Sequence, residues 1–576
     1  MRALLQNLHR HLHALSGVEL AEADWAPVPR RELGDVAIPC FKLAKALGKA
    51  PPQVAQELAQ KLKEIIDAGQ LPLAREVRAV GPYLNVFVAA EAYAREIGQS
   101  LARDPRRYGG SRKGDGKTVV IDFSSPNVAK EIGLHHIRST ALGNALANIA
   151  ECHGYKAVRL NYLGDWGTTH GKLILGLKMY SDESKLEGGG LKEMLDIYVR
   201  FNRDEKENPK LSEDAKEAFR KLEEGDAESR RIWKLFRDIS IREFKRLYDR
   251  LGIRFDHFDG ESLYNDRMEP RIKEIQDKIG TRVSEGALVC DLPGHKIPVL
   301  LRKDDGASLY ITRDLAAAED RWERFHPDHY WYVVAVQQKL HFQQLFDILK
   351  ILGKPYAANM EHVWFGMLAF GSKTMKTREG NVIILKDVLD EAKTRARAAI
   401  DAKNPGLARA DEVAEMIGTG AVLFSDLSQH RTHDVSFDWD KALSFEGDTA
   451  PFAQYSHARC NSLLRKGEAH RATLTAAPDA AARSALFEEE PVRNLVTELG
   501  FYASYLERAL ADRDPSQVAT SVLVVAKAMN HLYHKVRFLD EKQPARLEAL
   551  LELTRLTRDT LAHGLDLLGI RAPEEM

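Results

Sequence analysis

Apolar and polar residues follow two different rhythms along the chain, and the change between them divides it into parts. Short apolar runs typical of strands lie at 34–39 and 83–88, with apolar residues at helical spacing between 42 and 66. A stretch rich in glycine, proline and charge follows at 104–116 and is typical of a linker. These patterns predict a small α/β domain over 1–110.

The middle of the chain begins with a strand–helix–strand pattern. Strand-like runs lie at 118–123 and 156–162, and apolar residues at helical spacing fill 137–149 between them. Two strands joined by a helix are usually parallel neighbours in a sheet whose faces are covered by helices. The pattern therefore predicts a parallel α/β sheet.

A highly charged stretch interrupts this pattern after residue 181. We interpret it as solvated helices, an inserted module spanning about 181–285, because charge runs usually mark exposed helix faces. Beyond it, strand-like runs return at 287–291, 297–301 and 330–336. The sequence therefore predicts two half-sheets separated by the insertion, together forming one domain over 111–410.

After residue 411 the helical rhythm continues to the end without strand signals. In the last segment leucines recur at helical spacing, at Leu547, Leu550, Leu551, Leu561, Leu565 and Leu568. We therefore predict a separate all-helical domain over 411–576.

Composition excludes some classes of function. In a chain of 576 residues, 83 Lys and Arg nearly balance 84 Asp and Glu, which argues against a uniformly basic nucleic-acid binder. A local basic face is still enough to bind RNA. The four cysteines form no C-x-x-C pair, so they predict no zinc site, and scattered thiols favour a reducing, cytoplasmic location. We also expect no membrane span, since no apolar run reaches about 18 residues.

Polar and basic residues gather after the 118–123 strand. They are Ser124, Ser125, Asn127, Lys130, His135 and His136. Ligands of parallel α/β sheets bind beyond the carboxyl ends of the strands, and a helix N-terminus favours anions. Paired histidines alone are more often ordinary surface residues. It is their combination with a lysine at this point that predicts a phosphate site.

Residues 124–140 resemble the nucleotide signature of the class I aminoacyl-tRNA synthetases, in the form found in arginyl-tRNA synthetases. Further blocks agree with that family in order, at 161–168, 258–264, 309–316, 364–380 and 437–455. The resemblance implies a Rossmann-like catalytic domain over 111–410, an additional tRNA-binding domain over 1–110 and a helical anticodon-binding domain over 411–576.

The chain departs from the family pattern within this signature. Gly133 replaces the first histidine of the motif and His135 replaces its glycine, whereas the last histidine, His136, is kept. In the family, this glycine lets the adenine ring pack against the backbone. The imidazole of His135 must therefore swing aside or fill that space, and it can also replace the missing histidine from a shifted position.

The resemblance implies an arginine site. Asp122 and Asp314 stand where the family binds the guanidinium, and Tyr310 matches a tyrosine that lines the site. Carboxylates match the planar guanidinium, and their unpaired oxygens reject lysine or citrulline. The groups expected to hold the α-amino and α-carboxylate ends of arginine are Ser125, Asn127 and Gln338.

The resemblance also implies nucleotide and RNA contacts. His136 and Lys130 are expected to hold the ATP phosphates, joined by Lys376 and Arg378 from the loop that replaces the Lys-Met-Ser-Lys sequence of other class I members. Other residues expected to contact ATP are His135, Gly133 and Met367. Residues expected to contact tRNA are Gln454, Tyr455, Arg459 and Arg465, with Tyr502 and Tyr505 available to stack on bases.

The activity implied is arginine–tRNA ligation. Arginine reacts with ATP, supplied with Mg²⁺ and without a tightly bound metal, to give arginyl-adenylate and pyrophosphate. The arginyl group then passes to the 2′-hydroxyl of the terminal adenosine of the tRNA for arginine. A monomer without membrane contact is expected. Two alternatives stay open: a paralogue that activates arginine for another acceptor or has become regulatory, and a non-enzymatic RNA-binding protein.

Overall fold

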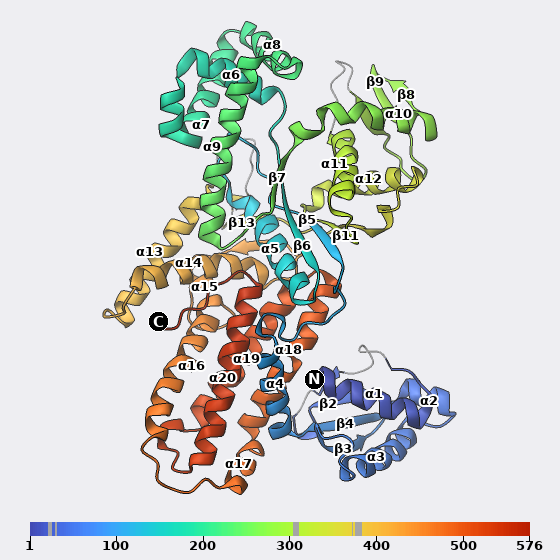
Figure 1. Cartoon of the computed structure of the whole chain (residues 1–576), viewed down its shortest axis with the longest axis vertical. Helices are drawn as coiled ribbons and strands as arrows, with labels where there is room; N and C mark the ends of the chain where they lie inside the picture. The colour runs from blue at the N-terminus through green and yellow to red at the C-terminus, as the bar shows by residue number, and fades with distance from the viewer. Residues whose placement is uncertain (21–25, 29–30, 303–309, 371–372, 375–382) are drawn as a thin grey trace.

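The computed structural model describes the chain at residues 1–20, 26–28, 31–302, 310–370, 373–374 and 383–576. A parallel sheet lies in the middle of the molecule (Figure 1), with an inserted group of helices above it in this view. The N-terminal domain and the C-terminal helices lie below the sheet.

The N-terminal domain is an antiparallel sheet packed against helices. Its strands lie in the order β1 (Ala26–Pro27), β2 (Val36–Pro39), β4 (Tyr83–Val88) and β3 (Ala74–Val80). Its helices are α1 (Arg2–Ser16), α2 (Phe41–Leu47), α3 (Pro51–Asp67) and α4 (Ala90–Arg103). Helix α3 buries Val54, Leu58 and Leu62, which one-turn spacing places on one face. The strands and helices predicted for this domain are confirmed.

The central sheet has five parallel strands. Their order is β12 (Met360–His362), β11 (His329–Tyr332), β5 (Thr118–Asp122), β6 (Lys156–Leu163) and β7 (His257–Gly260). Helix α5 (Ile137–Cys152), which joins β5 to β6, is buried along almost its whole length. Chain order reverses beside β5, and ligands of such sheets bind beyond the carboxyl ends of the strands at that point. The predicted parallel sheet is confirmed.

The helical insertion is shorter than predicted. It consists of α6 (Thr168–Tyr180), α7 (Glu183–Glu207), α8 (Lys210–Glu224) and α9 (Ala227–Leu251). The predicted module of 181–285 also included β7, which instead pairs with β6 in the central sheet. A four-residue strand after a long charged stretch has too little periodicity to be separated from it.

Two predicted strands do not join the central sheet. The runs at 287–291 and 297–301 form β9 (Ala287–Cys290) and β10 (Val299–Arg302), which pair antiparallel in a small sheet with β8 (Arg282–Ser284). The second half of the central sheet is therefore only β11 and β12. An apolar run indicates a strand but does not identify its partner.

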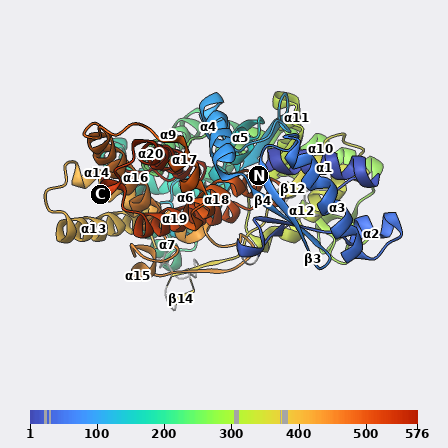
Figure 2. The same cartoon turned by 90° about the horizontal axis from the view of Figure 1, so that it is seen from below.

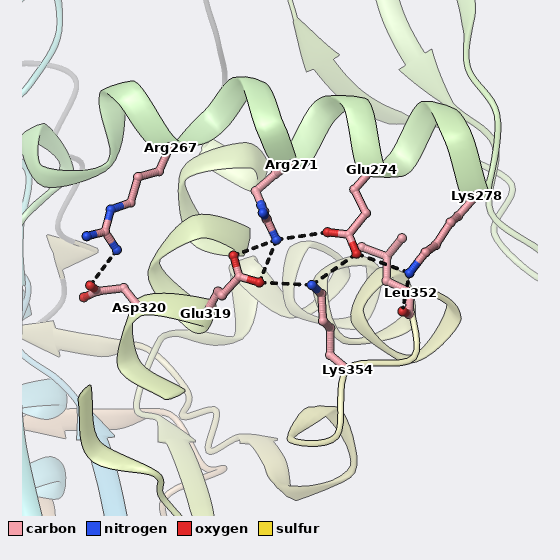
Figure 3. Close-up of polar contacts among 8 residues, drawn as sticks. All are labelled: Arg267, Arg271, Glu274, Lys278, Glu319, Asp320, Leu352 and Lys354. Carbon is pink, nitrogen blue, oxygen red and sulfur yellow. Dashed lines mark hydrogen bonds and ion pairs between the residues drawn. The ribbon is translucent and has the colours of Figure 1, made fainter. Parts of the chain in front are cut away.

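Three helices pack near β11: α10 (Met268–Lys278), α11 (Tyr310–Phe325) and α12 (Lys339–Ile351). Ion pairs join α10 to α11 and to the turn after α12 (Figure 3). Arg271 Nη1 lies 2.9 Å from Glu274 and 2.6 Å from Glu319. Lys354 Nζ lies 3.1 Å and 3.0 Å from the same two carboxylates. This network fixes α11, the helix that begins at Tyr310.

The C-terminal part is mainly helical. Its helices are α13 (Leu385–Lys403), α14 (Ala410–Leu427), α15 (Trp439–Ala442), α16 (Ala450–Arg471), α17 (Ala480–Phe487), α18 (Glu490–Asp512), α19 (Ser516–Lys535) and α20 (Pro544–Leu567). The prediction that only helices follow residue 411 is wrong at β15 (Val435–Phe437). This strand pairs parallel with β13 (Leu368–Phe370), which also pairs with β14 (Lys373–Thr374). Among the described helices, none combines the length and the apolar character that crossing a membrane requires.

The N-terminal domain is attached to α18. The Met1 ammonium donates to the carbonyl oxygen of Gly500 at 2.5 Å, and the Tyr93 hydroxyl donates to the same oxygen at 3.3 Å. Thr497 donates to the Asp35 carboxylate at 3.0 Å. From below, α1 to α3 lie to one side of the C-terminal helices (Figure 2).

Candidate active site

The chain leaves β5 through residues 124–136, which we call the signature loop. Ser124, Ser125 and Ala129 in this loop have positive φ angles of 73°, 50° and 64°. Left-handed backbone is unfavourable for residues with side chains and persists where surrounding contacts impose it. The loop is therefore held in one shape by its neighbours.

Helices α5 and α9 supply these contacts. The backbone N–H of Ser124 donates to Ser139 Oγ of α5 at 2.9 Å. From α9, the Tyr248 hydroxyl lies 2.7 Å from Ser124 Oγ, and Ser240 Oγ accepts the N–H of Ala129 at 3.0 Å. The helical insertion thus helps to shape the signature loop.

His135 and His136 end the signature loop. Their ring centroids are 3.9 Å apart, and His136 Nδ1 lies 3.3 Å from the carbonyl oxygen of Gly133. Burial, with smaller contributions from His135 and Lys130, lowers the pKa of His136 to about 3. Burial also lowers the pKa of His135, so both imidazoles are neutral at pH 7. In the described part of the chain, the buried Nδ1 of His135 has no hydrogen-bond partner.

Lys130 and Asn127 are exposed on the signature loop. Lys130 Nζ lies 5.9 Å from the centroid of the Tyr198 ring of α7. Asn127 approaches Gly164 so closely that a Cβ at that position would lie 2.1 Å from Asn127 Oδ1. Glycine at 164 therefore leaves room for the Asn127 side chain.

Met367 precedes β13 and is 40% exposed. Its N–H donates to Asp434 at 2.6 Å, and its carbonyl oxygen accepts from Arg138 of α5 at 3.2 Å. The buried Arg138 also forms an ion pair with Asp426 of α14 at 2.7 Å. Arg138 therefore joins the helix after the signature loop to the segment at Met367 and to α14. Lys376 and Arg378, predicted to act with them, lie outside the described residues.

Asp122 occupies the predicted place at the end of β5, but its carboxylate is already engaged. One oxygen pairs with Arg321 of α11 at 2.9 Å, and the other accepts from the Ser125 hydroxyl at 3.2 Å. The buried Arg321 also lies over the rings of Tyr162 and Tyr332, 5.1 Å and 5.6 Å from their centroids. The Asp122 carboxylate is therefore already paired with a guanidinium of the protein, and its contact with the substrate guanidinium stays a prediction.

Asp314 lies one turn after Tyr310 in α11, and its side chain is 20% exposed. His341 Nε2 of α12 lies 2.6 Å from Asp314 Oδ2. The charge of Asp314 contributes to a raised pKa of Asp122, whose main cause is burial, so the two carboxylates are neighbours. Tyr310 and Gln338 are exposed. We call Asp122, Tyr310, Asp314, Gln338 and His341 the arginine site, after the ligand that the sequence predicts for it.

A third carboxylate near Asp314, that of Glu261, was not predicted from the sequence. Burial raises the pKa of Glu261 to about 7, Asp314 and Asp165 add to the rise, and Arg313 opposes it. Arg313 Nη1 lies 3.5 Å from the Glu261 carboxylate. The block at 258–264 resembles the family, but that resemblance assigned no role to Glu261. Arg321 and His341 were missed as well, because helical spacing does not identify partners on other elements.

Tyr455 and Arg459 of α16 lie beside a hollow of about 620 Å³. The Arg459 guanidinium stands 4.7 Å from the Tyr455 ring and 4.8 Å from the ring of Tyr533 of α19. A second hollow of about 340 Å³ is also lined by Arg459 and Tyr533. Arg465 is exposed and pairs with Glu575 at 2.9 Å. Exposed aromatic and guanidinium planes beside hollows suit unstacked RNA bases.

Two predicted RNA contacts are buried instead. The amide of Gln454, which has no exposed surface, donates to the carbonyl oxygens of Met416 at 3.0 Å and Arg571 at 2.8 Å. Tyr502 is also buried and stacks on Tyr108 with centroids 5.2 Å apart. Both side chains connect segments of the protein, so neither is available to RNA. Helical periodicity did not show that these positions face the core.

Three features are those of the class I aminoacyl-tRNA synthetases. They are a parallel sheet whose chain order reverses beside β5, a strained loop with histidines at a helix N-terminus, and a helical domain with exposed stacking groups. Comparison with known families agrees. Residues 96–439 match the model described as tRNA synthetases class I (R), catalytic domain. Residues 2–88 match the arginyl tRNA synthetase N terminal domain, and residues 453–576 match the DALR anticodon binding domain.

Individual proteins agree with the domain matches. The chain is 41% identical to the arginine–tRNA ligase of Exiguobacterium sibiricum, over 98% of this chain and 97% of that protein. It is 42% identical to arginine–tRNA ligase 1 of Bacillus thuringiensis, over 95% and 94% of the two chains. The arginyl-tRNA synthetase of Thermus thermophilus superposes with a TM-score of 0.80 at 26% identity, over the full length of both chains. The chain belongs to the arginyl-tRNA synthetase family.

Proposed function

We propose that this chain is an arginine–tRNA ligase, which activates arginine with ATP and transfers it to the tRNA for arginine. The observation that carries the proposal is Asp314, a partly exposed carboxylate next to the end of β5 in a chain of the arginyl-tRNA synthetase family. A carboxylate pairs with both edges of a guanidinium, whereas a ureido or ammonium group leaves it poorly satisfied.

Arginine binds with its guanidinium at Asp314 and Tyr310. The Asp122 carboxylate, already paired with Arg321, lines the arginine site beside Asp314. The α-amino and α-carboxylate groups of arginine are held by Ser125, Asn127 and Gln338. Ser125 suits this role because the strained backbone of the signature loop fixes its position.

In the first step a carboxylate oxygen of arginine attacks the α-phosphorus of ATP. The bond from that phosphorus to the bridging oxygen breaks, pyrophosphate leaves and arginyl-adenylate remains. ATP enters with Mg²⁺. The protein contributes positioning and charge stabilisation more than covalent chemistry. The cations assigned to the phosphates are Lys130, Lys376 and Arg378.

The two histidines act as neutral groups in this proposal. His136, whose pKa burial lowers to about 3, carries a single ring N–H, which Nε2 can donate to a phosphate oxygen only in the tautomer that gives up the contact of Nδ1 with the Gly133 carbonyl oxygen. His135 stands where the family has glycine, and its buried Nδ1, without a hydrogen-bond partner among the described residues, reaches ATP if the ring turns. This arrangement accounts for the loss of the first histidine at Gly133. Met367 is assigned to the adenine end of ATP.

In the second step the terminal 2′-hydroxyl of the tRNA attacks the carbonyl carbon of the adenylate. The ester bond forms, AMP leaves and the hydroxyl proton passes to solvent. The RNA is held at its far end by Tyr455, Arg459 and Arg465. The two hollows around Arg459 are large enough to admit planar bases, which supports this assignment.

Arginine-dependent exchange of labelled pyrophosphate into ATP tests the proposal, measured with and without the matching tRNA. We expect exchange with tRNA present and little without it, as is usual in the family. Absence of exchange in both cases, from a protein that is folded and binds RNA, would contradict the ligase assignment. Exchange that persists fully without tRNA would favour a paralogue that serves another acceptor.

We also propose that the protein works as a monomer in the cytoplasm. Its four cysteines are free and buried, which suits a reducing compartment. Light scattering during gel filtration should give a mass close to the 64.7 kDa of one chain. A mass near twice that value at micromolar concentration would contradict the monomer.

A further inference from the structure

One contact in the arginine site has no role in the function proposed above. His341, in the first turn of α12, places Nε2 at 2.6 Å from Asp314 Oδ2. The two side chains are 21% and 20% exposed, so the contact is partly shielded from water and still open to a ligand. It joins α11 to α12, the helices on which the arginine site is built.

The two oxygens of the Asp314 carboxylate differ in their contacts. Oδ2 accepts from the imidazole, and among the described residues no protein donor is recorded for Oδ1. A carboxylate anchored through one oxygen cannot rotate freely about its Cβ–Cγ bond. Its second oxygen therefore points in a defined direction, which an incoming planar donor requires.

The ring of His341 is itself held in place. It packs edge-on against Phe342, with ring centroids 5.2 Å apart at an interplanar angle of 84°. Phe342 in turn packs on Tyr332 at the end of β11 and on His362 of β12, at 5.0 Å and 4.5 Å. The imidazole is thus tied to the central sheet through aromatic contacts.

The neighbouring carboxylate shows the same arrangement with a different partner. Asp122 is held by Arg321 and Ser125, one on each of its oxygens. Asp314 is held by a single imidazole and keeps one oxygen available. Asp314 is therefore the less engaged of the two carboxylates.

We propose that His341 is a positioning residue for arginine recognition, which orients the Asp314 carboxylate toward the substrate guanidinium. The inference rests on the proposed function, because it takes arginine as the ligand of this site. His341 does not touch the substrate. It acts through the hydrogen bond from Nε2 to Asp314, so a side chain that donates from the same place should replace it.

The test uses the full-length protein and three variants. His341→Ala removes the donor, and His341→Gln places an amide N–H near the position of Nε2. His295→Ala is the matched control, because His295 Nε2 makes an equivalent contact with Asp347 of α12 at 2.9 Å, outside the arginine site. Arginine binding is measured by calorimetry, and pyrophosphate exchange with tRNA gives separate KM values for arginine and ATP.

We expect His341→Ala to raise the arginine Kd and KM roughly tenfold to a hundredfold, the usual effect of losing a hydrogen bond to a charged group. The ATP KM and kcat should change little, because the lost contact orients only the arginine side chain. His341→Gln should recover most of the arginine affinity. His295→Ala should behave as the wild type does.

Two results would overturn the inference. One is an arginine KM in His341→Ala no higher than in His295→Ala. The other is an equal rise in the KM values for arginine and ATP that His341→Gln does not reverse, since this pattern reports general damage. Wild-type protein that binds arginine but supports no exchange would instead contradict the ligase assignment. The arginine Kd values of wild type and variants, measured by calorimetry, would then decide the role of His341.

Discussion

Charged side chains in the arginine site are distinguished by their partners. Asp122 lies against the buried Arg321, whereas Asp314 lies against an imidazole that occupies one oxygen. A carboxylate that already pairs with one guanidinium gains less from a second. We therefore propose Asp314 as the main contact for the substrate guanidinium, and its replacement should affect arginine more than ATP.

Asp314→Asn should raise the KM for arginine by roughly a hundredfold or more, because an amide oxygen pairs with a guanidinium without the attraction of opposite charges. The KM for ATP should change little. Steady-state pyrophosphate exchange at varied arginine and ATP provides both values. Asp347→Asn, which alters the carboxylate bonded to His295, is the control expected to leave both unchanged. Equal effects on the two substrates would show that the arginine site is misplaced.

The ionisation of Glu261 makes the free energy of unfolding depend on pH. Its folded-state pKa of about 7 lies above the ordinary value of 4.5, so the folded protein keeps a proton that the unfolded chain loses between these values. Its contribution to stability therefore falls as pH rises from about 4.5 to 7. Glu261→Gln removes this loss.

The unfolding midpoint of Glu261→Gln should accordingly rise relative to wild type between pH 5 and pH 8, by the equivalent of roughly 1–3 kcal/mol. Thermal unfolding followed by circular dichroism at a series of pH values measures this difference. Glu269→Gln changes an exposed carboxylate that pairs with Arg302 and should show no comparable trend. A difference independent of pH would contradict the raised pKa of Glu261.

Among the elements, α11 holds the proposed arginine contacts near its first turn and stabilising ion pairs farther along. Its first turn begins with Tyr310 and is followed by Asp314, while Glu319 joins the ion pairs of Figure 3. Lys354 contacts both Glu274 and Glu319 and is only 17% exposed. Ion pairs that share partners and are partly buried contribute more than isolated surface pairs.

Lys354→Met should lower the free energy of unfolding by about 1 kcal/mol at low salt, and the loss should shrink in concentrated salt as charges are screened. Denaturant unfolding at two salt concentrations measures both effects. Lys350→Met removes an exposed pair with Asp347 and should change stability by less than about 0.5 kcal/mol. A Lys354→Met loss that does not depend on salt would point to packing of the aliphatic stem.

At the scale of the whole molecule, buried contacts join the helix after the signature loop to the C-terminal part of the chain. Arg138, two residues after His136, holds the carbonyl oxygens of Met367 and His433 and pairs with Asp426 of α14. Helix α14 is therefore joined directly to the first turn of α5. We nevertheless expect substitutions to separate RNA binding at α16 from arginine activation.

Tyr455→Ala should weaken tRNA binding roughly tenfold, the cost of losing one stacking surface. The KM for arginine at saturating tRNA should stay unchanged, because α16 does not contribute to the arginine site. Filter binding with labelled tRNA measures the first effect. Tyr180→Ala disrupts a similar tyrosine–arginine contact, 4.5 Å from Arg200 and outside both hollows, and serves as the control. Equal weakening by both variants would contradict an RNA face at the two hollows.

Sequence patterns reveal elements better than partners. The runs at 118–123 and 156–162 are neighbours in the central sheet as predicted, because parallel strands joined by a helix leave few alternatives. The runs at 287–291 and 297–301 carry the same apolar signal and form a separate sheet. Among polar residues, Asp314 and Tyr455 are accessible as expected, whereas Gln454 is fully buried.

Local periodicity and ordered motifs were enough to indicate the family, the parallel sheet and the place of the signature loop. These follow from short-range preferences of the backbone and from residues adjacent in the chain. The partners of Asp122 and Asp314 emerged only from packing, because Arg321 and His341 reach them from other elements. Side-chain pairing across elements depends on how helices dock on a sheet, which no local pattern records.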